Sequence, residues 1–218
     1  MHCSGCAYPA AERQFDTAAA ERDLQRYRKK GPDATSRLLL TGVATHLVPG
    51  DSVLDVGGGV GVLDFELLSK GASTATLVDA SPSYLAAATA EAFRREQESR
   101  IRFVTGDFVG TADTIEPADI LTMHRVVCCY PNYVGLLDRA TQHSRRLLAL
   151  SYPRDRWFVR WWVALDNLFR RITRKEFRTF VHPPAAIERI VERAGFRRLS
   201  RSVTFVWSVD IYSRTSVA

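Results

Sequence analysis

The chain has 218 residues, 46% of them hydrophobic and 25% charged, a balance typical of one soluble globular domain and not of a disordered or fibrous protein. No stretch approaches the roughly 20 consecutive apolar residues of a membrane-spanning helix, and no apolar signal sequence follows Met1, so we expect a cytoplasmic protein. The net charge of +6 is compatible with an anionic partner and equally with a solvated basic surface.

The N-terminal segment predicts two helices. Residues 11–30 are rich in alanine, glutamate, arginine and lysine, which favour a helix that ends at Gly31-Pro32. Asp33 is placed to cap a second helix over residues 34–47. We interpret residues 1–47 as a helical arm that precedes a ligand-binding domain in residues 48–218.

Short apolar segments then alternate with helical ones, which predicts a mainly parallel sheet covered by helices on both faces. The expected strands are 52–56, 74–79, 101–105, 118–123 and 146–151, and the expected helices are 61–70, one from Ser81-Pro82, 133–144 and 184–194. Residues 196–214 contain two strand-like segments with no helix between them, which predicts a terminal antiparallel hairpin. The fold class is therefore α/β, a doubly wound seven-stranded sheet.

The turn after the first strand, in the sequence VLDVGGGVG, is rich in glycine. Such a turn lets a backbone approach a ligand where any Cβ would clash. A dinucleotide fingerprint, G-x-G-x-x-G, would need its third glycine at position 62, which is Val62. The third glycine is instead Gly61, so the spacing counts against a nucleotide-dependent oxidoreductase.

Asp55, two residues before the first glycine, completes D-x-G-x-G-x-G, which resembles motif I of the class I S-adenosylmethionine (SAM) methyltransferases. Two more features of that family follow at the right distances: Asp79 ends the second strand, and Asp107 follows the third. The resemblance covers about residues 50–214. It implies that the turn packs on the amino-acid part of SAM, that Asp79 binds the ribose hydroxyls and that Asp107 binds the adenine.

The resemblance therefore implies SAM as cofactor and S-adenosylhomocysteine (SAH) as its product, with no metal ion. We expect residues 8–30 to fold over the cofactor as a lid, with Phe15 and Tyr27 facing inward. The expected cofactor-binding residues are Asp55, Gly57, Gly59, Gly61, Asp79, Ala80, Asp107, Phe108, Met123 and Tyr27.

The methyl acceptor is expected beyond the fourth strand, in ADILTMHRVVCCYPN. The Asn/Asp/Ser-Pro-Pro-aromatic signature of amino-methylating nucleic-acid enzymes is absent there. Cys128 and Cys129 precede a proline, whereas the nucleophile of cytosine carbon-5 enzymes typically follows one, so we interpret both as small residues of a pocket floor. Cys3 and Cys6 form a single C-x-x-C, which is too few ligands for a structural zinc site.

His124 opens this segment and is the first candidate for a catalytic group. It is either a hydrogen-bonded structural histidine or a general base that takes a proton from the acceptor. Arg125 beside it suits an acceptor carboxylate or phosphate. Tyr130 and Tyr152 are the candidates for orienting the acceptor.

A closer resemblance is to the magnesium-protoporphyrin O-methyltransferase branch of the family. That branch has a phenylalanine-Asn/Asp-Thr stretch in its arm, like Phe15-Asp16-Thr17, and a histidine-tyrosine-proline after the fourth strand. Here the second motif is Cys129-Tyr130-Pro131, and Gln14 stands where the branch has a tyrosine. The scaffold resemblance is intact, but a porphyrin substrate does not follow from it.

The most distinctive stretch is an insert over about residues 152–183. It contains a helix, about 156–171, with three tryptophans, two leucines and a phenylalanine mostly on one broad face, surrounded by arginines. The helix suits a cap packed on the core, a lid over a bulky apolar acceptor, a membrane-surface contact or, less well, RNA. For the acceptor site we adopt the lid, with the aromatic face as the apolar wall of the pocket.

We therefore predict a SAM-dependent methyltransferase that acts on a small or medium organic acceptor. The acceptor is expected to be flat, largely apolar and anionic, and to be methylated on oxygen. The alternatives are an RNA- or protein-directed SAM methyltransferase, a nucleotide-dependent oxidoreductase, and a binding protein that keeps the fold without catalysis. The sequence does not predict the oligomeric state.

Overall fold

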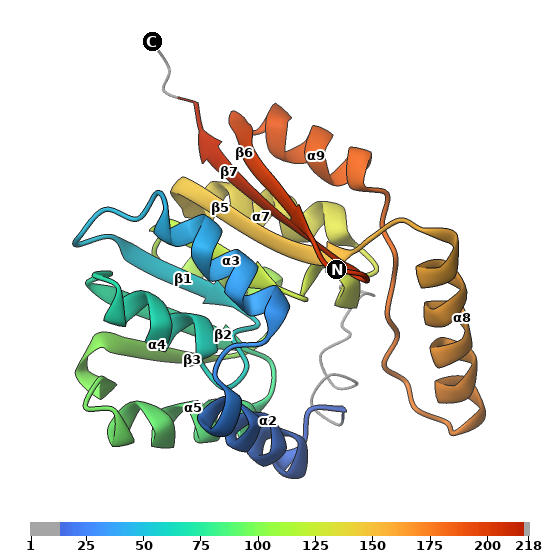
Figure 1. The fold of residues 1–218 in the computed structure, drawn as a ribbon, viewed down its shortest axis with the longest axis horizontal. Coiled ribbons are helices and arrows are strands. Elements are labelled where there is room, and N and C mark those ends of the chain that lie inside the picture. Colours follow the sequence, from blue (N-terminus) through green and yellow to red (C-terminus); the bar gives the residue numbers. More distant parts are fainter. Residues whose placement is uncertain (1–13, 216–218) are drawn as a thin grey trace.

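The structure is a computed structural model that describes residues 14–215. Its centre is a seven-stranded sheet in the order β3-β2-β1-β4-β5-β7-β6 (Figure 1). The first five strands are parallel, and β7 pairs antiparallel with both β5 and β6. The strands are β1 (Ser52–Val56), β2 (Thr74–Asp79), β3 (Ile101–Thr105), β4 (Ala118–His124), β5 (Ser144–Pro153), β6 (Phe196–Val203) and β7 (Trp207–Arg214). The predicted fold class is confirmed.

Helices cover both faces of the sheet. One apolar core lies under α2 (Thr17–Lys30), α3 (Ala34–Ala44), α4 (Val62–Ser69) and α5 (Pro82–Arg94), and the other under α6 (Phe108–Thr111), α7 (Tyr133–His143) and α9 (Pro184–Arg193). Neighbouring strand residues point to opposite faces, so Val53 enters the first core and Leu54 the second. Because both faces are covered, the central strands carry apolar residues on both faces, with Asp55 and Thr122 as buried polar exceptions. Short 3-10 turns are η1 (Glu98–Arg100), η2 (Ala112–Thr114) and η3 (Val127–Cys129).

The arm departs from the single helix expected over residues 11–30. The helix α2 starts at Thr17 because the Asp16 side chain accepts a hydrogen bond from the backbone N–H of Ala19, at 2.8 Å. An aspartate in this position caps a helix more readily than it continues one. Elsewhere α6 and η2 lie between β3 and β4, where the sequence pattern predicts no helix, and β5 is four residues longer than the predicted 146–151.

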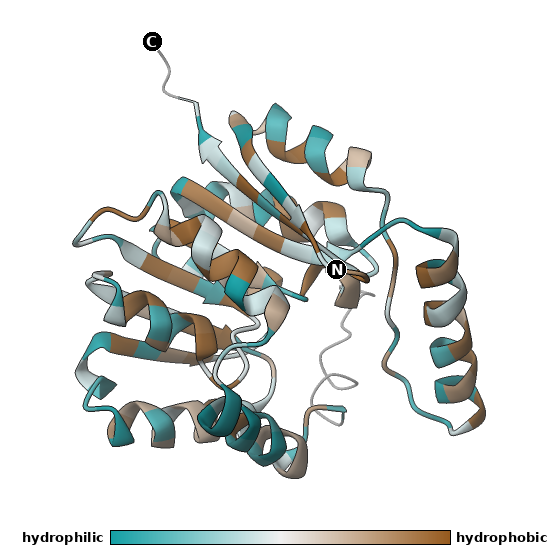
Figure 2. Ribbon diagram, in the orientation of Figure 1, coloured by the Kyte–Doolittle hydropathy of each residue, from teal (hydrophilic) through white to brown (hydrophobic). Residues whose placement is uncertain are grey.

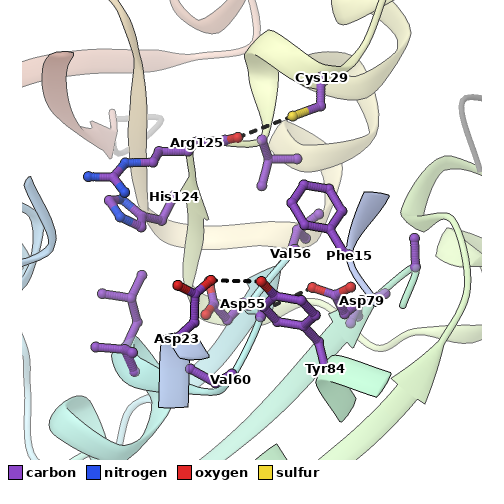
Figure 3. Close-up of a pocket in the computed structure, with 18 of the residues that line it drawn as sticks. Phe15, Asp23, Asp55, Val56, Val60, Asp79, Tyr84, His124, Arg125 and Cys129 are labelled. Atoms are coloured by element: carbon purple, nitrogen blue, oxygen red, sulfur yellow. Dashed lines mark hydrogen bonds between the residues drawn. The ribbon is translucent and has the colours of Figure 1, made fainter. Parts of the chain in front are cut away.

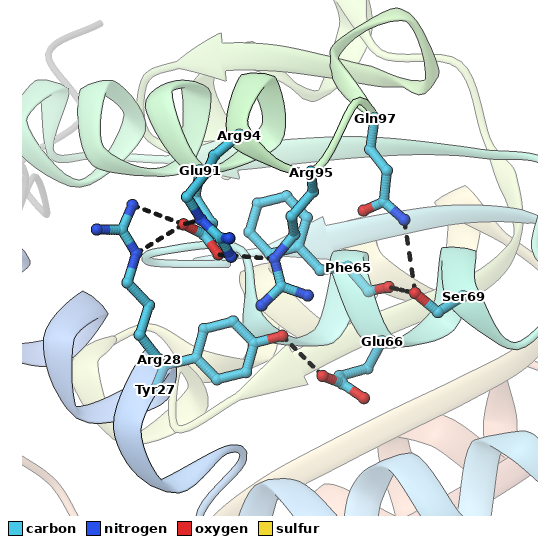
Figure 4. Close-up of polar contacts among 9 residues, drawn as sticks. All are labelled: Tyr27, Arg28, Phe65, Glu66, Ser69, Glu91, Arg94, Arg95 and Gln97. Carbon is cyan, nitrogen blue, oxygen red and sulfur yellow. Dashed lines mark hydrogen bonds and ion pairs between the residues drawn. The ribbon is translucent and has the colours of Figure 1, made fainter.

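Figure 4 shows how the arm is fixed to the domain. Glu91 of α5 is buried, and three guanidinium groups contact it at 2.6–2.7 Å, those of Arg28, Arg94 and Arg95. The hydrogen bond from Arg94, with those from Arg95 and Arg28, lowers the pKa of Glu91 to about 2. The Tyr27 hydroxyl donates to Glu66 at 2.7 Å, so α2 is tied to both α4 and α5.

The inserted helix α8 (Trp157–Ile172) lies apart from the layered body, on the right of Figure 1. Val159 and Val163 are its buried residues, and the chain returns from it along residues 173–183 to α9. Its existence and bounds agree with the sequence prediction to within one residue. Across residues 14–215, the structure contains no helix with the length and apolar character needed to span a membrane.

Candidate active site

The candidate active site is a cavity of about 320 Å³ at the carboxyl ends of β1, β2 and β4 (Figure 3). Val56, Asp79 and His124, the last residues of those strands, all line it. In open α/β sheets this edge is where ligands bind. The expected site residues that line the cavity are Tyr27, Asp55, Gly57, Gly59, Asp79, Ala80, Asp107, Phe108, His124 and Tyr130.

The glycine turn allows a ligand in the cavity to approach the backbone closely. Gly57 and Gly59 line the cavity with φ of 67° and 60°, a left-handed conformation that L side chains rarely adopt. A Cβ on Gly57 would lie 2.5 Å from Val126. Gly61 also has a positive φ, but it starts α4 and faces Phe65 in the core, so its predicted cofactor contact is corrected to a role in the turn itself.

Asp79 holds this turn in place. One of its carboxylate oxygens accepts the backbone N–H of Gly59 at 2.9 Å, and the other accepts that of Ser81 at 2.8 Å. Burial raises the pKa of Asp79, and the two N–H donors oppose that rise. Each carboxylate oxygen keeps a second acceptor position, so the group can still bind hydroxyls in the cavity.

Segments far apart in the sequence meet over the cavity. The Phe15 ring packs edge-on against Tyr84 of α5 and Phe177 of the insert, with centroids 5.7 and 5.4 Å away. The Tyr84 hydroxyl donates to Asp23 of α2 at 2.7 Å (Figure 3). Phe15 and Tyr27 both line the cavity, and residues 8–13 of the predicted lid lie outside the described residues.

Tyr130 closes the cavity beside Asp107. Its hydroxyl donates a short hydrogen bond to the Asp107 carboxylate, and burial raises the pKa of Tyr130. The phenol therefore stays protonated, and its O–H group points to the Asp107 carboxylate. The structure thus links a residue expected to orient the acceptor with one expected to bind adenine.

His124 is held between two serine hydroxyls. Its Nδ1 lies 2.9 Å from Ser151 Oγ, and its Nε2 lies 3.1 Å from Ser36 Oγ. Burial, with the nearby positive charge of Arg125, lowers the pKa of His124 to about 4. The imidazole is therefore neutral near pH 7. Nothing in the sequence distinguished Ser36 from other helical serines, and only the folded arm brings it to His124.

Arg125 lies at the same end of the cavity in an unusual conformation. Its φ is 62°, which costs energy in a residue with a side chain. The guanidinium pairs with Asp33 at 2.8 Å and lies 4.9 Å from the centre of the Trp207 ring. The backbone N–H of Arg125 donates to Ser151 Oγ at 2.9 Å, so the contacts that hold His124 also hold Arg125.

Two further expected site residues lie outside the cavity. Met123 is buried in the core under α7, and the Tyr152 hydroxyl donates to buried Asp210, which also pairs with Arg201. Strand alternation explains both corrections, because Met123 precedes His124 and Tyr152 follows Ser151, so each points to the opposite face of the sheet.

The predicted aromatic wall of the acceptor site is also wrong. Trp157, Trp161 and Trp162 are 80%, 64% and 63% exposed, and none of them lines the cavity. The amphipathic pattern of α8 correctly indicated two faces, but Val159 and Val163 form the buried one. The insert instead contributes Phe177, which lies beyond the helix.

The adjacent cysteines differ in exposure. Cys129 lines the cavity and Cys128 is buried beneath it, and both thiols donate to the carbonyl oxygen of Arg125 at 3.3–3.4 Å. The contact with Cys129 and burial raise the pKa of Cys128 well above its usual value. A protonated, buried thiol is a poor nucleophile. Cys3 and Cys6 lie outside the described residues.

A buried pair of carboxyl groups lies under the glycine turn, and sequence reasoning missed half of it. Asp55 accepts a short hydrogen bond from Thr122, but within residues 14–215 its second oxygen and both oxygens of Asp64 have no hydrogen-bond partner. Burial raises the pKa of Asp55 to about 7, and burial next to Asp55 raises that of Asp64. The only signal for Asp64 was an acid in the first turn of an otherwise apolar helix.

Asp64→Asn should make the protein less sensitive to rising pH. A carboxyl group whose pKa is raised by folding stabilises the folded state fully at pH values below its unfolded pKa, near 4. That stabilisation is lost as the pH rises through the folded pKa, which is about 7 for Asp55. An amide at position 64 removes one of the two charges. We expect the variant to gain about 2 kcal/mol in free energy of unfolding, relative to the native chain, between pH 5 and pH 8.

Urea denaturation at the two pH values measures this difference. Asp113→Asn is the matched control, because Asp113 is 78% exposed in a surface ion pair with Arg139. If the difference in free energy of unfolding between Asp64→Asn and the native chain does not change with pH, ionisation of the Asp55–Asp64 pair does not destabilise the fold.

The glycine turn, the acids at the ends of β2 and β3, and the antiparallel β7 together define a class I SAM-dependent methyltransferase. A profile described as a methyltransferase domain matches residues 19–200, so the chain belongs to that family. This membership confirms that the protein is a SAM-dependent methyltransferase and not the oxidoreductase that was the alternative. No curated protein matches the chain by sequence.

Solved structures agree with this fold. Magnesium protoporphyrin IX methyltransferase from Synechocystis PCC 6803, with bound SAH, superposes with a TM-score of 0.74 at 19% identity, covering 94% of this chain and 98% of that one. An O-methyltransferase family protein from Burkholderia thailandensis gives 0.72 at 17% identity, covering 99% and 65%. Human N-acetylserotonin methyltransferase in complex with SAM gives 0.64 at 18% identity, covering 92% and 57%.

Proposed function

We propose that this enzyme transfers the methyl group of SAM to an oxygen of a small or medium, largely apolar acceptor that carries one anionic group. The observation that carries the proposal is the make-up of the cavity. Buried acids and the glycine turn line part of it, and Arg125, His124 and the rings of Phe15 and Phe177 also line it. One cavity therefore offers a polar site for a cofactor and a partly apolar, cationic site for an acceptor.

The residues present fit SAM. Gly57 and Gly59 present bare backbone to the cavity in a left-handed conformation, and Asp79 retains acceptor positions for the ribose hydroxyls. Asp55, Gly57 and Gly59 would hold the amino-acid part, and Asp107 with the backbone of Phe108 would hold the adenine. Bound there, SAM supplies a methyl group on a good leaving group, so much of the rate acceleration comes from alignment.

At the acceptor end, the two adjacent residues have different roles. Arg125 is permanently charged, and its planar guanidinium suits a carboxylate or phosphate of the acceptor. His124 is neutral near pH 7, so it can take a proton from a hydroxyl acceptor that replaces Ser36 as the hydrogen-bond partner of Nε2. A carboxylate acceptor is already ionised and would need only to be positioned.

Binding and transfer are tested separately. Calorimetry should show binding of SAH and none of NADH. Transfer from methyl-labelled SAM should then be followed with flat aromatic carboxylic acids and phenols, and with matched amines and neutral esters. We expect label on the oxygen acceptors that carry an anionic group. Failure to bind SAH would overturn the cofactor assignment, whereas SAH binding with transfer only to amines, RNA or protein would overturn the acceptor alone.

A further inference from the structure

The outward face of α8 is a large apolar surface. Seven of its large apolar side chains are 43–80% exposed: Trp157, Trp161, Trp162, Leu165, Leu168, Phe169 and Ile172. At about 100° per residue they occupy an arc of roughly 140°, and Val159 and Val163 point the other way, to the buried side. Exposed apolar patches of this kind mark binding surfaces in globular proteins.

Positive charge is concentrated around the same face. Residues 154–178 hold eight arginines and lysines and three acids, so they carry +5 of the chain's net charge of +6. Asp155 and Asp166, two of those acids, pair with Arg160 and Arg170. Arg171, Arg174 and Lys175 are exposed at the end of the helix. We therefore expect the partner of this face to offer an apolar surface next to negative charges.

The helix is also attached to the body in one orientation. The Phe158 ring stacks on Phe205, in the turn between β6 and β7, with centroids 4.8 Å apart. Phe205 is itself 75% exposed, so it extends the apolar surface beyond the helix. The Asn167 side chain donates to the carbonyl oxygen of Thr179 at 2.7 Å, which fixes the returning chain against α8.

We propose that α8 docks on an anionic lipid surface, with its tryptophans in the interface and its basic residues toward the headgroups. Tryptophan is favoured at the boundary between headgroup and hydrocarbon, and an amphipathic helix with basic residues lies in the plane of that boundary. Each nearby lysine or arginine adds attraction to anionic lipid. Figure 2 shows α8 at the outside of the molecule with apolar residues along it.

The remaining residues of the chain do not suit this surface as its partner. Residues 1–13 contain only Met1 and Tyr8 as large apolar side chains, too few to cover three tryptophans. A second copy of the chain would bring a second strongly basic α8 region against the first, so like charges would oppose pairing. The docking proposal concerns binding alone and does not depend on the proposed acceptor.

Tryptophan fluorescence makes the test specific. Three of the four tryptophans lie on α8, and the fourth, Trp207, lies in β7. The full chain is mixed with phosphatidylcholine vesicles, with or without phosphatidylglycerol, at low and high salt. We expect a blue shift and co-sedimentation with the anionic vesicles, at least about tenfold tighter than with the zwitterionic ones, and weakened by salt.

Variants assign the contact to α8. Trp161→Ala with Trp162→Ala should weaken binding at least about tenfold, and Arg171→Glu with Arg174→Glu should remove the preference for anionic lipid. Phe93→Ala is the matched control, because Phe93 is 73% exposed on α5 and should not affect binding. Absence of binding, or equal binding by the tryptophan variant, would overturn the proposal. A native dimer in sedimentation equilibrium that the tryptophan variant abolishes would overturn it as well.

Discussion

Asp79→Ala should weaken SAH binding by about 3 kcal/mol, roughly a hundredfold in Kd. The native carboxylate accepts the N–H groups of Gly59 and Ser81 while it faces the cavity, so the substitution removes the ribose contact we propose and also loosens the turn. Hydrogen bonds to a charged group are worth about 1.5–3 kcal/mol each. Calorimetric titration with SAH measures the loss directly.

The control is Asp113→Ala, which removes an exposed aspartate outside the cavity and should leave Kd unchanged. Asp79→Asn should lie between the native chain and the alanine variant, because an amide oxygen still accepts one N–H. Thermal melting identifies any loss that comes from unfolding. A folded Asp79→Ala variant with native affinity would remove Asp79 from the cofactor site.

The second large effect is expected at His124. His124→Ala should lower turnover on a hydroxyl acceptor by about a hundredfold, the low end of the range for loss of a general base, because a base with a low pKa takes protons less readily. SAH affinity should remain nearly native. Since the pKa of His124 is about 4, kcat/KM of the native enzyme should be independent of this group above about pH 5 and fall as pH drops through 4.

His46→Ala is the matched control, a half-buried histidine that does not line the cavity. Arg125→Gln separates binding from proton transfer, because it should raise KM for an anionic acceptor more than it lowers kcat. Full activity of His124→Ala on a hydroxyl acceptor would mean that positioning alone suffices or that another group takes the proton.

The cofactor side of the site was the more predictable because its demands are local. A turn that needs left-handed residues requires glycine at fixed positions, as at Gly57 and Gly59, and an acid at the end of a parallel strand must lie at the same edge as that turn. These constraints are visible within a few residues of sequence. The same is true of the terminal hairpin, because a helical segment is missing between two strands.

The acceptor side was harder to predict because it depends on side-chain orientation and on contacts between distant segments. Periodicity showed that α8 has an apolar face but not which face turns inward. In the structure two valines are buried and the three tryptophans are exposed. An offset of a single strand residue separated His124 in the cavity from Met123 in the core. The contact of Ser36 with His124 spans 88 positions and exists only once the arm is folded.

Phe15 has a consequence for the order of events in turnover. Its ring touches both α5 and the insert, and its carbonyl oxygen accepts the Ser81 hydroxyl at 2.6 Å, next to the acid that holds the glycine turn. The arm thus forms part of the walls of both the cofactor and the acceptor regions. We expect an ordered kinetic mechanism, in which the cofactor enters before the acceptor, the methylated product departs first, and the spent cofactor leaves when the Phe15 contacts open.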